Sequence, residues 1–192
     1  FYNACPPTKN IDLPQGYVIP QGWNKVVQRL RQNGVKLRKL QADTVMELTV
    51  YYISDYTTVP KPYEGHYLHS NVKVDRQHKK MALRKGDYFI PINQPAKRYL
   101  VEVLEPTAPD AFFAWGFFDG VLQQKEGYSD YVFEDLAAEM VAQDKVLKEK
   151  LELRRKQDPA FAKDGRAQLN FVFQNSAYHE PEHMRYPVYR LE

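Results

Sequence analysis

The chain has 192 residues with 27 basic and 24 acidic side chains, and 43% of its residues are hydrophobic and 14% aromatic. This apolar content is that of a folded domain and excludes extended disorder. No apolar run approaches the roughly 20 residues of a membrane span, and the single cysteine, Cys5, excludes an internal disulfide or a multi-thiolate metal site. Because the chain begins at Phe1 without a leader, we expect a piece of a longer or processed protein.

Charge is distributed unevenly along the chain. Residues 1–98 hold 16 Lys/Arg and 7 Asp/Glu, whereas residues 99–192 hold 11 and 17, and the stretch 23–40 carries six basic side chains and no acidic one. Such asymmetry occurs on nucleic-acid-binding faces, and also on solvated surfaces or on halves that pack together. We expect no nucleic-acid partner, because the sequence lacks a zinc finger and an RNP motif.

The first half of the sequence predicts mainly strands. Residues 1–13 predict an irregular connector, and residues 17–40 predict a β-α-β unit whose helix is followed by the stop signal Asn33-Gly34. The helix is indicated by apolar residues at helical spacing, namely Trp23, Val26, Val27 and Leu30. Antiparallel strands with tight turns are predicted over 45–53, 70–75, 80–83 and 88–91.

The second half of the sequence predicts mainly helices. Helical spacing covers 95–104, and further helices are expected after the capping residues Ser129 or Asp130, Asp144, and Asp158 with Pro159. Residues 169–173 are assigned as buried structure of uncertain type. This segregation predicts an α+β fold with a mixed or antiparallel sheet, in one accessory domain over 14–192. We expect its core to include Trp23, Val26, Leu30, Leu48, Val50, Phe89, Leu100, Leu104, Trp115, Leu136 and Met140.

Two His/Glu clusters are candidate metal sites. His179 to His183 fits H-E-x-x-H, in which a helix places both imidazoles on one zinc ion. Pro181 opposes that helix, so we expect a polar surface turn and no shared metal ion. In residues 62–69, His66 and His69 are three apart, which is poor spacing for ligands on a strand. A loop held by its own packing is favoured there, with a metal site or a ligand contact as alternatives.

Other catalytic constellations are weak. Cys5 is flanked by proline, and no Gly-x-Ser-x-Gly sequence occurs. The carboxylate pairs Glu134/Asp135 and Glu102/Glu105 are expected to be solvated on helices. The aromatic residues of 112–118 predict core packing, with a stacking platform for sugar rings as the alternative. We therefore expect no catalytic residue.

A set of ordered segments resembles one family. They are YVIP (17–20), W-x-x-V-x-x-L-x-x-N-G (23–34), PYEGH (62–66), GDYFIPINQPAKR (86–98), LEPTAPDAFFAWGFFD (104–119), YVFEDLAAEM (131–140), DPAFA (158–162), LNFVFQNSAY (169–178) and YPVYR (186–190). From about Leu13 to Arg190, the chain resembles the region that follows the catalytic domain in large bacterial zinc carboxypeptidases of the carboxypeptidase A type. In that family an H-x-x-E pair and a later histidine hold the zinc in the preceding domain, and none of these motifs is matched in a suitable setting here.

The resemblance implies a non-catalytic C-terminal accessory domain with a structural or substrate-recognition role. Its implied partners are the preceding catalytic domain and a peptide or cell-wall substrate, and its implied location is periplasmic or secreted. The alternatives are an independent metal-dependent hydrolase that uses the His/Glu clusters, and a sugar or cell-wall binding module.

If the chain has a ligand surface, we expect it in the loop 62–69 and near two further polar residues. The ring of Tyr63 can stack on a ligand, and Arg98 can hold a carboxylate with two hydrogen bonds. The full set of candidate ligand-binding residues is Tyr63, Glu64, His66, His69, Gln94 and Arg98. The competing interpretation is that these side chains tie the loop to the sheet.

Overall fold

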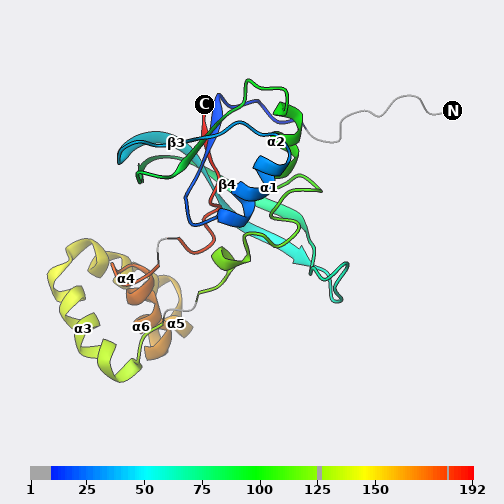
Figure 1. Ribbon diagram of the computed structural model, residues 1–192. Coiled ribbons are helices and arrows are strands. Elements are labelled where there is room, and N and C mark those ends of the chain that lie inside the picture. The colour runs from blue at the N-terminus through cyan, green and yellow to red at the C-terminus, as the bar shows by residue number, and fades with distance from the viewer. Residues whose placement is uncertain (1–9, 125–126, 181) are drawn as a thin grey trace. The chain divides into compact units, whose positions relative to one another are not determined.

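The computed structural model describes residues 10–124, 127–180 and 182–192 (Figure 1). The chain divides into two compact units, Phe1–Leu122 with Met184–Glu192, and Gln123–His183. We call them the sheet unit and the helical unit. All six strands of the described chain belong to the sheet unit, and the regular structure of the helical unit is helical. The predicted α+β class is therefore confirmed.

The sheet unit contains one antiparallel sheet of six strands in the order β2-β5-β1-β6-β3-β4. Helix α1 (Asn24–Gln32) connects β1 to β2, and β5 lies between these two strands. The predicted β-α-β unit therefore forms with a third strand inserted. The strands are β1 (Gly16–Ile19), β2 (Arg38–Lys39), β3 (Thr44–Thr58), β4 (His69–Leu83), β5 (Tyr88–Pro91) and β6 (Tyr189–Leu191).

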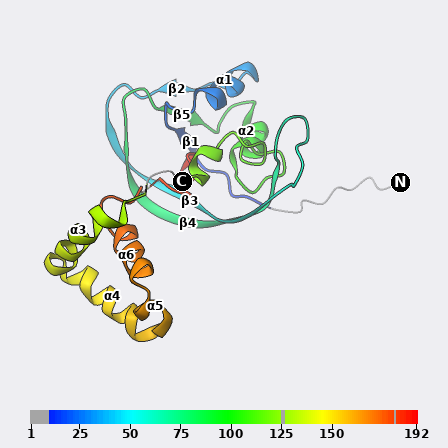
Figure 2. The same ribbon diagram turned by 90° about the horizontal axis from the view of Figure 1, so that it is seen from below.

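Two strand predictions need correction. The separate strands expected over 70–75 and 80–83 are one continuous β4, which pairs with β3 from Thr44 to Thr58 (Figure 2). The side chains of residues 75–80 are all exposed, so no apolar alternation marks the middle of this strand in the sequence. Strand β6 was not predicted, because its three residues are too few for a periodic pattern, yet it lies between β1 and β3.

The core of the sheet unit lies mainly between the sheet and its helices. Helices α1 and α2 (Lys97–Leu104) and the segment 111–118 contribute buried side chains on one side of the sheet. A smaller cluster around Val18, Leu48 and Val50 includes residues of β1, β3, β4 and β6. Six of the expected core residues are buried: Val26, Leu30, Leu48, Val50, Leu100 and Leu104. Trp23, Phe89, Trp115, Leu136 and Met140 are only half-buried, which corrects the expectation for these five.

The helical unit has its own core. Its helices are α3 (Asp130–Gln143), α4 (Lys145–Gln157), α5 (Pro159–Lys163) and α6 (Gly165–Gln174), and α6 contains the unassigned stretch 169–173. The buried side chains are Phe133, Ala137, Leu147, Leu151, Val172 and Phe173. The shared core expected over 14–192 is therefore wrong for these helices, whose apolar faces pack on one another. The domain boundaries themselves stay a prediction.

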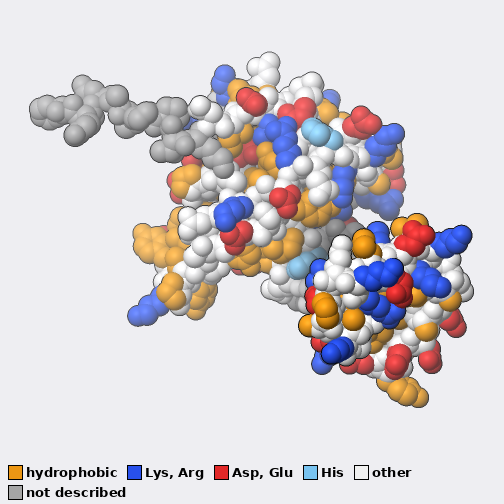
Figure 3. Space-filling model, turned by 180° about the vertical axis from the view of Figure 1, so that it is seen from behind, with side chains coloured by type: hydrophobic (Ala, Val, Ile, Leu, Met, Phe, Trp, Pro, Cys, Tyr) orange, Lys and Arg blue, Asp and Glu red, His pale blue; other side chains and the backbone are white. Residues whose placement is uncertain are grey.

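Helices α4 and α5 begin at the capping residues that the sequence predicts, whereas Ser129 before α3 makes no side-chain capping bond within the described residues and the Asp164 cap of α6 was not predicted. Asp144 Oδ1 accepts hydrogen bonds from the Val146 and Leu147 amides at 2.8 and 3.0 Å, and Asp158 caps α5 in the same way. Basic and acidic side chains are interspersed on the face of this unit seen in Figure 3. This surface is typical of solvated helices.

We expect Asp144→Ala to destabilise the helical unit by about 1 kcal/mol, because two amides of α4 lose their acceptor. Hydrogen exchange should show faster exchange in α4, with β1 and β6 unchanged. Glu149→Ala, an exposed change in the same helix, is the matched control and should leave exchange in α4 nearly unchanged. Equal loss of protection in β1 and α4 would instead show one cooperative domain.

Candidate functional site

An open cavity of about 510 Å³ lies in the sheet unit between α1 and the aromatic segment that follows α2. We call it the α1 groove. Its lining residues are Lys25, Gln28, Arg29, Gln32, His66, Trp115, Gly116 and Phe117. Its volume falls in the range of small-molecule sites, roughly 300–1,000 Å³.

One wall of the groove is the polar face of α1. Positions 25, 28, 29 and 32 share a helical face, while Val26, Val27 and Leu30 anchor the other face in the core. Arg29 Nη1 lies 3.4 Å from Gln32 Oε1, to which it donates. Neither Lys25 nor Arg29 forms an ion pair with any residue that the structure describes. This wall is therefore positively charged and lacks a neutralising partner within that part of the chain.

The opposite wall is the aromatic segment 115–117. A tight turn forms here, with φ of 73° at Gly116 and a 3.0 Å hydrogen bond from its amide to the Phe113 carbonyl. Phe113 and Phe118 are fully buried on either side of this turn. Trp115 and Phe117, between them, are half-buried and line the groove.

A hairpin turn brings part of the predicted loop to the groove. The amides and carbonyls of Tyr63 and His66 exchange two 2.9 Å hydrogen bonds, and φ is positive at both Glu64 and Gly65, as a type I′ turn requires. The His66 ring lies edge-on to Trp115 with 5.6 Å between ring centroids. Tyr63 is 58% exposed, and its ring centroid lies 6.5 Å from that of Trp115.

The other predicted ligand residues lie elsewhere. The Gln94 amide holds the loop after α1, donating to the Lys36 carbonyl at 3.0 Å and accepting from the Lys36 amide at 2.8 Å. Arg98 is exposed on α2, and neither residue lines the groove. Glu64 is exposed in the hairpin turn. The structure thus brings Tyr63 and His66 to one site, and ligand contact by any of the six stays a prediction.

The buried His69 imidazole bridges two polar side chains that are more exposed, Thr58 and Asp119. Its Nδ1 lies 2.9 Å from Thr58 Oγ1 and its Nε2 lies 3.0 Å from Asp119 Oδ1. A serine-hydrolase triad has the opposite arrangement, with the carboxylate at Nδ1 and the hydroxyl at Nε2. The imidazole also packs against the rings of Tyr56 and Phe113. We interpret these contacts as a link between β3, β4 and the end of the aromatic segment, and the competing interpretation, that the loop side chains tie it to the sheet, stays a prediction.

The H-E-x-x-H segment was a candidate metal site. The His179 and His183 rings lie edge-on with 6.5 Å between centroids, and His179 also contacts the Phe173 ring. Pro181 lies outside the described residues. Within the described ranges, no group of three or more His, Cys, Asp or Glu side chains converges as metal ligands do. The expectation that these histidines share no metal ion stays a prediction.

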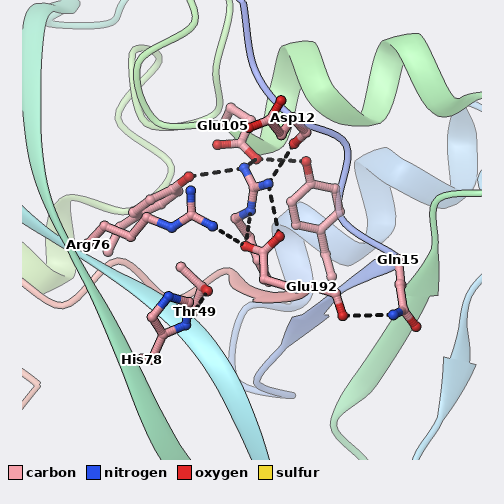
Figure 4. Close-up of polar contacts among 10 residues, drawn as sticks. Asp12, Gln15, Thr49, Arg76, His78, Glu105 and Glu192 are labelled. Carbon is pink, nitrogen blue, oxygen red and sulfur yellow. Dashed lines mark hydrogen bonds and ion pairs between the residues drawn. The ribbon is translucent and has the colours of Figure 1, made fainter.

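A second polar cluster surrounds Arg190 on β6, and Figure 4 labels its partners Asp12, Glu105 and Glu192. Its Nη1 donates to Glu105 Oε1 at 2.8 Å and to the Tyr51 hydroxyl at 3.0 Å. Its Nη2 donates to the Asp12 carbonyl at 2.6 Å, and its Nε donates to Glu192 Oε1 at 3.0 Å. Sequence reasoning placed Glu105 in solvent, but its side chain is only 2% exposed, because Arg190 supplies a buried partner.

The tyrosines around this cluster stay protonated. Burial raises the pKa of Tyr17, and the Glu105 carboxylate, which accepts a 2.8 Å hydrogen bond from the Tyr17 hydroxyl, raises this pKa further. Burial, and next the negative charge of Glu105, also raise the pKa of Tyr186. Among the described residues, no buried side-chain nitrogen or oxygen lacks a hydrogen-bond partner. This cluster, whose buried polar atoms are all satisfied, joins β3, β6 and the end of α2.

Comparisons with known proteins give one weak similarity. A segment of 103 residues, 54% of this chain, is 29% identical to Carboxypeptidase 2 of Trichophyton tonsurans, and the same holds for the proteins of that name in Trichophyton equinum and Trichophyton rubrum. A region of this chain is similar to carboxypeptidases. The chain covers only 19% of the length of these relatives. All three are fungal, so the bacterial origin in the resemblance stays a prediction.

Two other comparisons are negative. No family model matches the chain, and no solved structure matches it. In the described parts of the chain, no helix has the length and apolar character needed to cross a membrane. The periplasmic or secreted location is a separate matter and stays a prediction.

Proposed function

We propose that this chain is a non-catalytic, C-terminal region of a zinc carboxypeptidase and that the α1 groove recognises a ligand of that enzyme. The similarity of 103 residues to Carboxypeptidase 2 supports the carboxypeptidase part of this proposal. The resemblance to the region after the catalytic domain supports the position. Its partner is then the preceding catalytic domain, and the protein is periplasmic or secreted.

The observation that carries the recognition role is the charge of the groove. Lys25 and Arg29 project from one face of α1, without an ion-pair partner in the described chain, opposite the rings of Trp115 and Phe117. An arginine can hold a carboxylate through two parallel hydrogen bonds, and a nearby lysine adds a second positive charge. An anionic ligand with an apolar face would therefore satisfy both walls at once.

Catalysis is assigned to the preceding domain. A catalytic zinc site needs three protein ligands and an open position, and the described residues of this chain do not offer such a set. The His and Glu side chains that the structure describes therefore do not fit a zinc site. The alternative of an independent hydrolase would require that the chain alone releases amino acids from peptides.

The proposal predicts that the isolated chain, supplied with zinc, does not hydrolyse peptides. In the enzyme that contains the catalytic domain, the double variant Lys25→Gln/Arg29→Gln should raise KM about tenfold with kcat unchanged, because a site remote from the reacting bond contributes equally to substrate and transition-state binding. Steady-state kinetics and thermal unfolding of both proteins provide the measurement.

Lys80→Gln is the matched control, because Lys80 is an exposed cation on β4 outside the groove. This variant should change KM by less than about twofold relative to the unmodified enzyme. A fall in kcat with unchanged KM in the double variant contradicts recognition by the groove. Amino-acid release by the isolated chain contradicts the non-catalytic role.

A further inference from the structure

We propose that the ligand of the α1 groove is an acidic sugar, namely a pyranose ring that carries a carboxylate within a glycan. This inference rests on the proposed function, because it names the ligand class of the same recognition site. The four chemical features of the groove that carry it are its rings, its amides, its cations and its volume.

The aromatic wall offers ring faces to a sugar. A pyranose presents C–H groups on one face, and these pack favourably on the electron-rich face of an indole. Trp115 is half-buried, so part of its ring remains accessible in the groove. The exposed ring of Tyr63, with its centroid 6.5 Å from that of Trp115, extends the aromatic surface beyond the groove lining. A neighbouring sugar of the same glycan can pack there.

The polar wall matches a polyhydroxylated acid better than a simple anion. Gln28 and Gln32 lie on the same face of α1 as the two cations. Each amide has two N–H donors and a carbonyl acceptor, whereas lysine and arginine only donate. Sugar hydroxyls both donate and accept, so they can pair with the N–H groups and with the carbonyl oxygens of these amides, of which Gln32 Oε1 already accepts one 3.4 Å contact from Arg29. Lys25 and Arg29 are left to bind the carboxylate.

The volume of the groove agrees with a ligand larger than a single anion. At about 510 Å³, the cavity exceeds what one carboxylate or phosphate group occupies. The lining combines two apolar rings with five polar side chains, so it is more polar than the usual small-molecule site and suits a ligand with many hydroxyl groups. A ring-shaped ligand would fill this space and reach both walls.

The test titrates the 192-residue chain with trigalacturonate and with two matched probes. The methyl ester of trigalacturonate keeps the sugars and removes the charge, and triglutamate keeps acidic groups and removes the sugars. Calorimetry and tryptophan fluorescence should show trigalacturonate binding at least tenfold more tightly than either probe.

Variants locate the binding in the groove. Arg29→Gln and Trp115→Ala should each weaken trigalacturonate binding at least tenfold, and Lys80→Gln should change it less than twofold. Trp115→Leu keeps apolar bulk and serves as the second variant where Trp115→Ala lowers thermal stability. It should weaken binding as well, because it removes the ring face.

The possible results separate this inference from the proposed function. Tighter binding of triglutamate overturns the sugar assignment and keeps the groove as a recognition site. Equal binding of the methyl ester overturns the role of the carboxylate, and trigalacturonate binding that survives Arg29→Gln overturns the location. Failure of all three probes to bind counts against both proposals.

Discussion

Replacing Arg190 by methionine is expected to lower the free energy of unfolding by about 3–5 kcal/mol, which is the cost of leaving a buried charge without its partner. The Glu105 side chain is 2% exposed and would lose its ion pair with the guanidinium. The Tyr51 hydroxyl and the Asp12 carbonyl would lose hydrogen bonds at the same time. Urea-induced unfolding followed by circular dichroism measures the change.

Two companion variants show whether the ion pair is the cause. Arg190→Met/Glu105→Gln removes both charges and should recover part of the loss, which a double-mutant cycle quantifies. Arg76→Met removes only a partly exposed ion pair with Glu192 and should cost less than about 1 kcal/mol. A loss below about 1 kcal/mol for Arg190→Met would mean that the cluster does not stabilise the sheet as described.

Replacing Phe118 by alanine is expected to cost about 3–5 kcal/mol, the range for deleting a large buried aromatic side chain. Phe118 is fully buried, and its ring packs edge-on against Trp23 at 4.9 Å and Tyr186 at 5.0 Å between centroids. It also anchors the turn that carries Trp115 and Phe117. We therefore expect ligand binding to the α1 groove to weaken in the folded fraction of this variant.

The matched control for Phe118→Ala is Leu153→Ala, because Leu153 is 56% exposed on α4 in the helical unit. That change should alter the free energy of unfolding by less than about 0.5 kcal/mol. Urea unfolding gives the stability, and near-ultraviolet circular dichroism reports the environment of Trp115 and Trp23. Unchanged binding by the Phe118 variant would show that the turn does not depend on this anchor.

Local signals in the sequence were sufficient to predict several helices and the fold class. Helix α1 followed from the spacing of Val26, Val27 and Leu30, and α4 and α5 followed from Asp144 and from Asp158 with Pro159. These signals act within a few residues, so no knowledge of the tertiary fold is needed to read them. The α+β class followed from the order of the predicted elements.

Features that depend on distant residues could not be predicted in this way. Glu105 is buried because of Arg190, which is 85 positions later in the chain, and β6 is a strand because β1 and β3 flank it. The α1 groove likewise joins α1 to residues near positions 66 and 115. Its parts had separate local signals, namely the run of basic residues over 23–40, the candidate ligand loop 62–69 and the aromatic residues of 112–118, but no signal in the sequence indicated that these segments meet in one cavity.

The most direct test of the recognition role is a two-dimensional ¹H–¹⁵N spectrum of the chain during titration with trigalacturonate, its methyl ester and triglutamate. We predict shifts of the α1 amides, of residues 115–117 and of the Trp115 indole with at least one acidic probe, while the amides of β4 from residue 75 onward stay in place. Shifts confined to other parts of the chain, or no shift with any of the three probes, would contradict a ligand-binding α1 groove.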